Sequence, residues 1–314
     1  MNQTIHVAAC CDENYIAYAG VMMISALEAT PTANIHFHLI NCKIAASSLE
    51  KLQNLVGERG GRLHIYLPND DLYRGLPTLR YGEAVYQRIN LPEYIPSDID
   101  RLIYIDSDTL VLGDLNELWQ TDLKGKLVAA VENLSPTACQ DIGFARTEYF
   151  NSGLLLMDLD GWRKEKIHQQ VSEYARDNAH RLQYVDQCSL NAVLKDRWLR
   201  LGPDWNQQSD IYKVVIKYHE GSSYSQANLQ NAILNPSVVH FTGKKKPWKI
   251  YCFHPFKKRY QQVLASTPWA NLRAPDDTLG NRLSYYTAFR QLWKCYRRRL
   301  ALNKFHEEKT NHGS

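Results

Sequence analysis

Two aspartates separated by one residue, Asp106 and Asp108, directly follow the apolar run at 102–105. A β-branched and aromatic run of this length is typical of a buried strand, which would present both carboxylates at its carboxyl end. In an extended chain, residues i and i+2 point to the same side, with Cα atoms roughly 6.6 Å apart. Both carboxylates can therefore bind one hard divalent cation and leave ligand positions for phosphate oxygens. The pattern predicts a metal site at a strand end.

A second polar segment, 240–248, begins with His240 and contains three consecutive lysines. An imidazole nitrogen suits a metal already held by two carboxylates, particularly manganese. Gly243 would let the backbone approach a phosphate closely, and a lysine would supply a point charge to a diphosphate. Taken alone, His240 fits a hydrogen-bonded core histidine better, and the lysines fit a solvated run.

Alternating apolar runs predict the elements that must position these segments. Strands at 5–9, 35–40 and 63–67 alternate with helices at 15–29 and 46–56. This order predicts an α/β fold, with a mostly parallel central sheet and helices on both faces. Further predicted elements are strands at 102–105, 126–131, 153–157 and 238–241, helices at 161–178 and 186–194, and an irregular polar excursion over the active face at 204–235.

Ligands of open α/β sheets bind outside the carboxyl ends of the strands. We expect four segments there: 12–14, 106–108, 151–153 and 240–246. Asp12 and Asn14 follow the first strand, where their short polar side chains could hydrogen-bond a base or a ribose. Without the other segments they would be read as a helix cap.

Length and composition fit a soluble globular protein with one large α/β domain, or with one domain and a small appendage. The chain has 314 residues, of which 44% are hydrophobic and 22% charged. No uninterrupted apolar stretch of ~18 residues is present, so no segment is expected to span a membrane. The start of the chain lacks the pattern of a secretory signal. Seven cysteines, an odd number without zinc-ligand spacing, predict a reduced, cytoplasmic protein.

The carboxyl-terminal segment, 278–314, is strongly basic, with eight Lys or Arg residues against two Glu, in a chain of net charge +4. The remaining body, 1–277, is nearly neutral, which argues against nucleic acid as a partner. Apolar positions from Leu283 to Leu300 recur at spacings of three and four, which predicts an amphipathic helix. Such a helix would lie on an anionic membrane, or alternatively dock on its own domain.

Five ordered segments together resemble the retaining glycosyltransferases of family eight. The resemblance is strongest to the bacterial lipo-oligosaccharide α-galactosyltransferases, and glycogenin is a more distant relative. The matching segments are 12–15, 104–108, 149–153, 186–191 and 240–248. They span residues 5–250 in the family's order. The resemblance implies a GT-A-type nucleotide-binding fold over 1–277, with 278–314 as a helical basic tail.

The resemblance also implies roles for individual residues. Asp106, Asp108 and His240 would hold Mn²⁺, or Mg²⁺, which bridges the diphosphate of UDP-galactose or UDP-glucose. Asp186 and Gln187 are the implied catalytic residues, with Gln187 beneath the anomeric carbon. The implied donor-binding residues are Asp12, Asn14 and Tyr15 at the uridine, Gly243 and Lys246 at the diphosphate, Arg88 and Ser107 beside them, and Asn133, Asn151, Asp186 and Gln187 at the sugar.

Two positions depart from the family pattern. Cys188 stands where close relatives commonly carry an acid, and Asn133 stands where they often carry an aspartate near the donor sugar. A covalent route through residue 188 would need thiolate chemistry. We therefore favour same-face attack with the diphosphate as base, and the donor stays open between galactose, glucose and an N-acetyl sugar.

The expected activity is metal-dependent, retaining hexosyl transfer to a lipopolysaccharide or lipo-oligosaccharide core. The enzyme would be cytoplasmic and peripheral on the inner face of the plasma membrane, held there by the basic tail. One alternative is a glycogenin-like initiator that glycosylates its own tyrosines. Another is a non-catalytic protein that binds UDP-sugars.

Overall fold

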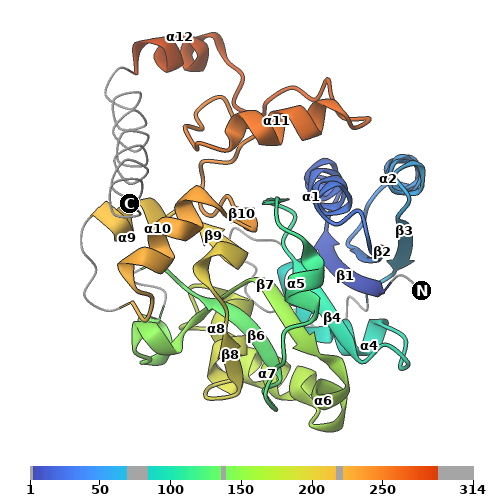
Figure 1. Ribbon diagram of the computed structural model, residues 1–314, viewed down its shortest axis with the longest axis vertical. Helices are drawn as coiled ribbons and strands as arrows, with labels where there is room; N and C mark the ends of the chain where they lie inside the picture. Colours follow the sequence, from blue (N-terminus) through green and yellow to red (C-terminus); the bar gives the residue numbers. More distant parts are fainter. Residues whose placement is uncertain (1–2, 69–83, 136–138, 217–221, 289–314) are drawn as a thin grey trace, which may run out of the picture.

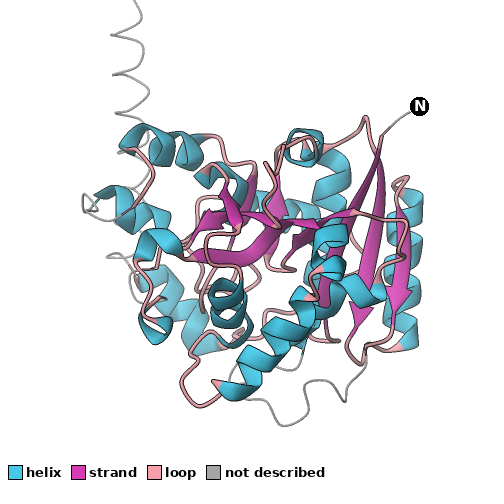
Figure 2. Cartoon of the chain, turned by 90° about the horizontal axis from the view of Figure 1, so that it is seen from below, coloured by secondary structure: helices cyan, strands magenta, loops and turns pink. Residues whose placement is uncertain are grey.

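A computed structural model describes residues 3–68, 84–135, 139–216 and 222–288. Within them, a seven-stranded sheet has the order β3-β2-β1-β4-β7-β6-β8, and helices cover both of its faces (Figures 1 and 2). Its strands are β1 Thr4–Cys11, β2 Asn34–Asn41, β3 Arg62–Tyr66, β4 Arg101–Ile105, β6 Val128–Glu132, β7 Phe150–Asp158 and β8 Trp198–Arg200. This mostly parallel sheet confirms the predicted α/β fold.

The first half of the chain forms the expected β-α-β-α-β unit. Helices α1 (Ile16–Ala29) and α2 (Ala46–Glu58) cover one face of β1–β3. Alternate residues of β1, such as Ile5 and Val7, are fully buried in the core beneath α1. Glu13, in the turn after β1, accepts hydrogen bonds from the backbone N–H of Ala45 (2.8 Å) and the hydroxyl of Ser48 (2.7 Å). These bonds tie the turn after β1 to the start of α2.

The opposite face of β1–β3 carries four imidazoles. His6 of β1 lies opposite His36 of β2, and His38 of β2 lies opposite His64 of β3. His6 Nδ1 lies 2.9 Å from His38 Nε2, and His38 Nδ1 lies 2.9 Å from the hydroxyl of Tyr66. His38 is 1% exposed. Burial lowers the pKa of His6 to about 4 and that of His38 to about 3, so both rings are neutral at pH 7.

Farther along the sheet, the second core is covered by α6 (Leu159–Lys164), α7 (Ile167–Asp177) and α8 (Val185–Val193). The single helix predicted at 161–178 is therefore wrong. Lys166 adopts φ 52°, in the left-handed region, and separates α6 from α7. Short helices α3 (Ala84–Gln87) and α4 (Leu91–Tyr94) flank a 3-10 turn that holds Arg88.

Strand β7 corrects the predicted sheet in a way that matters for the site. It pairs antiparallel with both β4 and β6. The segment 151–153 was expected at the carboxyl end of a strand, but it lies at the beginning of β7. Because β7 is reversed, its first residues reach the same edge of the sheet as the ends of the parallel strands.

A second, three-stranded sheet has the order β5-β10-β9, with β5 Thr109–Val111, β9 Gln207–Gln208 and β10 Val238–His240. Strand β10 runs antiparallel to β5 and places His240 opposite Thr109. Since β5 begins one residue after Asp108, this pairing carries His240 to the predicted metal ligands. The short helix α5 (Leu115–Trp119) follows β5, and the side chain of Asp114 caps it.

The expectation that 204–235 is irregular is wrong. This stretch contains β9 and two helices, α9 (Ile211–Ile216) and α10 (Gln226–Leu234). The helices share a small core that includes Ile211 and Leu229. Its polar sequence is misleading because buried side chains are hydrogen-bonded: Gln207 Nε2, for example, donates to Ala232 O at 2.8 Å.

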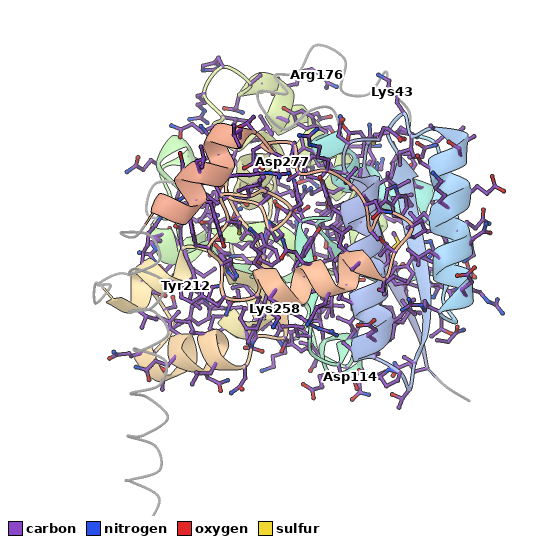
Figure 3. The ribbon with its side chains drawn as sticks, turned by 90° about the horizontal axis from the view of Figure 1, so that it is seen from above. Lys43, Asp114, Arg176, Tyr212, Lys258 and Asp277 are labelled. Carbon is purple, nitrogen blue, oxygen red and sulfur yellow. The ribbon has the colours of Figure 1, made fainter. Side chains whose placement is uncertain are left out.

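Helices α11 (Lys257–Ala265) and α12 (Leu279–Thr287) end the described chain. Asp277, which Figure 3 labels, lies just before α12 and accepts hydrogen bonds from Arg273 and Arg282. Leu279 and Leu283 are 75% and 59% exposed. Among the described helices, none combines the length and hydrophobicity that a membrane span requires. Most of the predicted basic tail, from residue 289, lies outside the described residues.

Candidate active site

Asp106, Asp108 and His240 converge at the edge where β4 ends and β10 ends. Their ligand atoms all lie within 4.8 Å of one another. His240 Nε2 lies 3.2 Å from Asp108 Oδ1 and 3.7 Å from Asp106 Oδ2. Two carboxylates and one imidazole nitrogen form a donor set suited to a divalent metal such as manganese. The structure thus brings together the three residues predicted as metal ligands.

Asn206 orients the imidazole of His240. Its Oδ1 lies 3.0 Å from His240 Nδ1, and its Nδ2 donates to Asn151 Oδ1 at 2.8 Å. Because Asn206 offers an oxygen to the ring, Nδ1 carries the proton, and the lone pair of Nε2 is directed at the carboxylates. Sequence reasoning missed Asn206, which lies in the polar stretch that predicted no defined structure.

Gly153 leaves the space that His240 occupies. A Cβ atom at this position would lie 2.2 Å from His240 Cε1 and 2.9 Å from Asp106 Oδ2. Both distances are far shorter than van der Waals contact. Glycine is therefore required here by close approach of side chains.

One oxygen of Asp106 is held by the protein and the other faces the cluster. Oδ1 accepts a hydrogen bond from the hydroxyl of Tyr104 at 2.7 Å and lies 3.0 Å from Arg88 Nη2. Oδ2 is the atom that faces His240. Such outer contacts orient a metal ligand. Tyr104 belongs to the 104–108 motif, but its role was not foreseen.

Asp108 is ionised because the effect of Lys246 and His240 on its pKa is larger than the opposite effect of its burial. Burial alone would raise its pKa, but Lys246 and His240 hold the pKa well below the usual range. Lys246 Nζ contacts Asp108 Oδ2 and donates to Phe241 O at 2.8 Å. Gly243, at φ 80°, occupies the left-handed region that the turn before Lys246 requires.

Arg88 connects the metal cluster to helix α8. Its Nη2 lies 3.0 Å from Asp106 Oδ1, and its Nε lies 3.0 Å from Asp186 Oδ2. Its Nη1 donates to Ser152 O at 2.9 Å. Arg88 is 7% exposed and Asp186 is 3% exposed. Burial raises the pKa of Asp186 to about 6, although Arg88 opposes this shift.

Gln187 is fixed at both ends of its amide. Oε1 accepts from Asn151 Nδ2 and from the backbone N–H of Ser152, each at 3.1 Å. Nε2 donates to the hydroxyl of Tyr149 at 3.2 Å, and that hydroxyl lies 3.1 Å from Cys188 Sγ. Cys188 is 0% exposed, so its thiol packs inside the protein. Tyr149, in the 149–153 motif, is a further positioning residue that sequence reasoning did not single out.

The residues predicted for uridine lie after β1, the strand next to β4. The backbone N–H of Asn14 donates to Asp12 Oδ1 at 3.0 Å, which forms a compact turn before α1. Tyr15 is 39% exposed and packs edge-on against Trp248, with ring centroids 5.9 Å apart. Trp248 in turn stacks on Tyr18. The 12–15 and 240–248 motifs therefore meet through aromatic contacts.

Two further predicted residues lie beside this core of the site. Ser107 is 6% exposed, between the two metal-ligand aspartates in sequence. Asn133 follows β6, and its Oδ1 accepts from the backbone N–H of Ser135 at 2.8 Å. Its own backbone N–H donates to Tyr149 O at 2.8 Å, which fixes it next to the start of β7.

The geometry agrees with the outcome of a comparison with known families. The sequence profile described as "Glycosyl transferase family 8" matches residues 6–252. The chain belongs to glycosyl transferase family 8. This family 8 chain is similar to General stress protein A of Bacillus subtilis, with 30% identity over 286 residues, 87% of this chain and 98% of that protein. It is also similar to the Lipopolysaccharide 1,2-glucosyltransferase of Escherichia coli K12, with 27% identity over 278 residues, 85% of this chain and 80% of that protein.

Solved structures support the same assignment. The galactosyltransferase LgtC, in complex with donor and acceptor sugar analogs, superimposes on the family 8 chain with a TM-score of 0.76 and 28% identity. The match covers 84% of this chain and 96% of LgtC. An active-site mutant of LgtC, in which glutamate replaces a glutamine, gives a TM-score of 0.75 and 27% identity. The GT-A-type fold expected from the sequence motifs is therefore confirmed.

Proposed function

We propose that this glycosyltransferase transfers galactose or glucose from a UDP-sugar to an oligosaccharide acceptor, such as a lipopolysaccharide core, with net retention. The observation that carries the proposal is the convergence of Asp106, Asp108 and His240 beside the Gln187 network. A metal-binding cluster next to buried amide groups can hold a diphosphate and a sugar at once. The names of the lipopolysaccharide glycosyltransferases among its relatives favour this acceptor class.

The cluster fits Mn²⁺ by donor type, spacing and orientation of its three ligands. When bound, the ion would supply positive charge that stabilises the diphosphate as it leaves. Lys246, already beside Asp108, would add a second positive charge at the leaving group. The exposed edge of Tyr15 and the turn at Asp12 and Asn14 would contact the uridine.

Retention follows most simply from attack on the same face of the sugar. The bond between the anomeric carbon and the diphosphate oxygen breaks, and its electron pair leaves with UDP. The acceptor hydroxyl forms the new bond to carbon, and its proton passes to the leaving diphosphate. Two buried side chains support this route over a covalent one: the Cys188 thiol is 0% exposed, and the Asp186 carboxylate faces Arg88.

A panel of UDP-sugars, read out by UDP release with and without Mn²⁺, tests the proposal. We expect turnover with UDP-galactose or UDP-glucose that is lost in Asp108→Asn and retained in Asp122→Asn, an exposed residue outside the cluster. Tight UDP binding without turnover would favour a non-catalytic binding protein. A gain of hexose in the intact mass of the protein would favour self-glycosylation.

The carboxyl-terminal segment, from residue 278, is proposed to hold the enzyme on the inner face of the plasma membrane. The exposed Leu279 and Leu283 of α12, with Arg282 between them, support this role. Removal of all residues after Asp277 should release the protein from vesicles that contain phosphatidylglycerol. Unchanged co-sedimentation of the truncated protein would contradict membrane association through this segment.

A further inference from the structure

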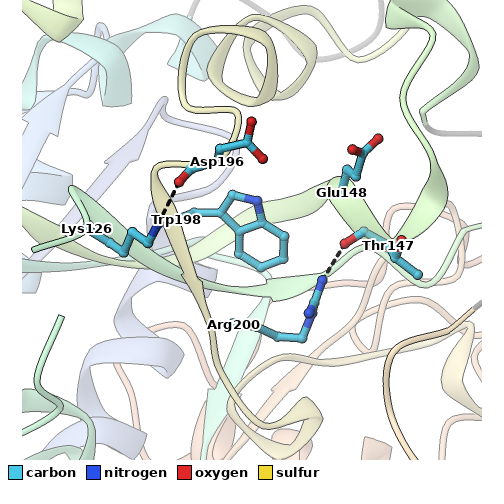
Figure 4. Close-up of a pocket in the computed structure, with 6 residues that line it drawn as sticks. All are labelled: Lys126, Thr147, Glu148, Asp196, Trp198 and Arg200. Atoms are coloured by element: carbon cyan, nitrogen blue, oxygen red, sulfur yellow. Dashed lines mark hydrogen bonds between the residues drawn. The ribbon is translucent and has the colours of Figure 1, made fainter. Parts of the chain in front are cut away.

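A pocket of about 320 Å³ lies at the free edge of the sheet, beside β8. Figure 4 shows the indole of Trp198 at its centre, with charged side chains around it. The lining residues are Lys126, Thr147, Glu148, Asp196, Trp198 and Arg200. None of them belongs to the metal cluster or to the Gln187 network described above.

The indole supplies an apolar surface inside a polar rim. Trp198 is half-buried, and its ring packs against Phe150 with centroids 5.4 Å apart. The guanidinium of Arg200 lies 4.9 Å from the indole centroid and forms an adjoining wall. A sugar ring has an apolar C–H face and a hydroxyl periphery, so it matches an aromatic surface that is surrounded by polar groups.

The charges of the rim favour a neutral ligand. Lys126 and Arg200 are balanced by Glu148 and Asp196. Both cations already form hydrogen bonds within the protein: Lys126 Nζ donates to Asp196 O at 2.7 Å, and Arg200 donates to Thr147 O. Glu148 is also engaged, since its Oε2 accepts from the backbone N–H of Ala145 at 2.9 Å and its Oε1 lies 3.8 Å from Lys195 Nζ. A phosphate would still meet the carboxylate of Asp196, whereas sugar hydroxyls can donate to it. The pocket is therefore better suited to an uncharged polyol than to a nucleotide.

The pocket is connected to the active site through the start of β7. Phe150, which contacts Trp198, is followed directly by Asn151, which donates to Gln187. Thr147 and Glu148 precede Tyr149 in the same segment. β8 lies three strands from β4, which corresponds to about 14 Å across the sheet. The register also places Trp198 level with Leu102, four residues before Asp106, which adds roughly 13 Å along the strands and gives a separation of roughly 19 Å. Only an extended acceptor of several sugar units would therefore reach from the reacting centre to the pocket.

We propose that the Trp198 pocket binds a neutral sugar residue of the oligosaccharide acceptor, at a distance from the hydroxyl that is glycosylated. That this sugar belongs to an acceptor follows only if the proposed transferase function is correct. The pocket would lengthen the acceptor site, so that longer glycans bind more tightly than their terminal sugars alone.

The test uses an array of neutral glycans built of hexoses, heptoses and N-acetylhexosamines. Saturation-transfer NMR then measures the binding of glycans selected from this array to the protein, without donor or metal. We expect binding that weakens at least tenfold in Trp198→Leu, a loss of about 1.4 kcal/mol, and also weakens in Asp196→Asn. The matched controls are Trp269→Leu and Glu58→Gln, which change residues near the other end of the sheet. In a separate experiment, UDP-glucose and UDP-galactose are tested as competitors. If either one displaces the glycan from the Trp198 pocket, the ligand of the pocket is the donor and not the acceptor.

Donor hydrolysis separates failure of this proposal from failure of the proposed function. Trp198→Leu and Asp196→Asn should release UDP from the donor at the wild-type rate, and should raise KM for long acceptors but not for a terminal disaccharide. The proposal is overturned if no glycan of the array binds, or if binding survives Trp198→Leu. Thermal unfolding of Asp196→Asn, a surface substitution, controls for loss of folding.

Discussion

The side-chain oxygen of Asn206 lies 3.0 Å from Nδ1 of His240 and thereby directs Nε2 of the imidazole at Asp106 and Asp108. This contact comes from outside the recognised motifs. It determines which ring nitrogen is available to a metal, so the metal site depends on a fourth residue that is not one of its three candidate ligands.

Asn206→Ala should weaken metal binding by roughly 10- to 100-fold, because it removes the hydrogen bond that fixes the tautomer and the orientation of the His240 imidazole. The Mn²⁺ concentration that gives half-maximal UDP release measures this effect. Asn54→Ala, at an exposed position of α2, is the matched control. An unchanged Mn²⁺ requirement in Asn206→Ala would show that Asn206 does not orient His240.

Gly153→Ala should displace His240 and Asp106, since the added Cβ would lie 2.2 Å from the imidazole. We expect loss of metal-dependent activity and destabilisation by about 1–3 kcal/mol, measured by urea unfolding. Gly57→Ala, where no atom lies within 4 Å of the added Cβ, should instead stabilise the protein by up to about 1 kcal/mol. Wild-type metal affinity in Gly153→Ala would contradict the close-approach argument.

Cys188→Ser should leave the rate of transfer within about threefold of wild type, because the buried thiol touches Tyr149 rather than the donor. The measurement is kcat with the preferred UDP-sugar and a saturating acceptor. A loss of several orders of magnitude, together with a trapped glycosyl adduct in the wild type, would instead establish Cys188 as a nucleophile.

Stability should fall on acidification through the imidazoles on β1 and β2. The folded-state pKa values of His6 and His38, about 4 and about 3, lie below the ordinary value of 6.5. The unfolded chain therefore takes up protons first. The free energy of unfolding that comes from burying these imidazoles in their neutral form is fully present above pH 6.5. It is lost progressively as the pH falls from 6.5 toward the folded-state pKa values. Each ring contributes a slope of up to about 1.4 kcal/mol per pH unit.

Urea unfolding between pH 7.5 and pH 4.5 measures this slope. His38→Gln should flatten it, because the neutral amide keeps polar contacts to His6 and Tyr66 without titrating. The exposed His180→Gln is the control and should follow the wild type. Equal slopes in wild type and His38→Gln would contradict the assignment.

The strand-end pattern predicted Asp106 and Asp108 as metal ligands, whereas His240 was assigned to them through the family resemblance. Asp106 and Asp108 follow β4, and His240 ends β10. The pairing that unites them could not be predicted, since β5 has only three residues and its partner lies more than a hundred residues away. The direction of β7 was also hidden, because an apolar run carries no sign of its orientation within a sheet.

Buried polar residues limited the prediction elsewhere. Asn206 and Gln207 are both 0% exposed, yet polar residues in a Pro- and Gly-containing stretch predict a surface loop. Their burial depends on partners distant in sequence, such as His240 and Ala232. Such partners are recognisable only when the fold has brought them together.

The reversed direction of β7 has a consequence for how this site can change over time. The chain leaves the active edge after β1 and β4 through turns, but it arrives there at Asn151 and continues through a bulge into β7, which is paired on both sides from Leu155 to Met157. Insertions are tolerated in turns more readily than next to a doubly paired strand. Asn151, Ser152 and Gly153 are also held by hydrogen bonds to Gln187 and Asp106. This wall should therefore keep its shape among enzymes of different substrate preference, while the chain after β1 and around 240–248 diversifies.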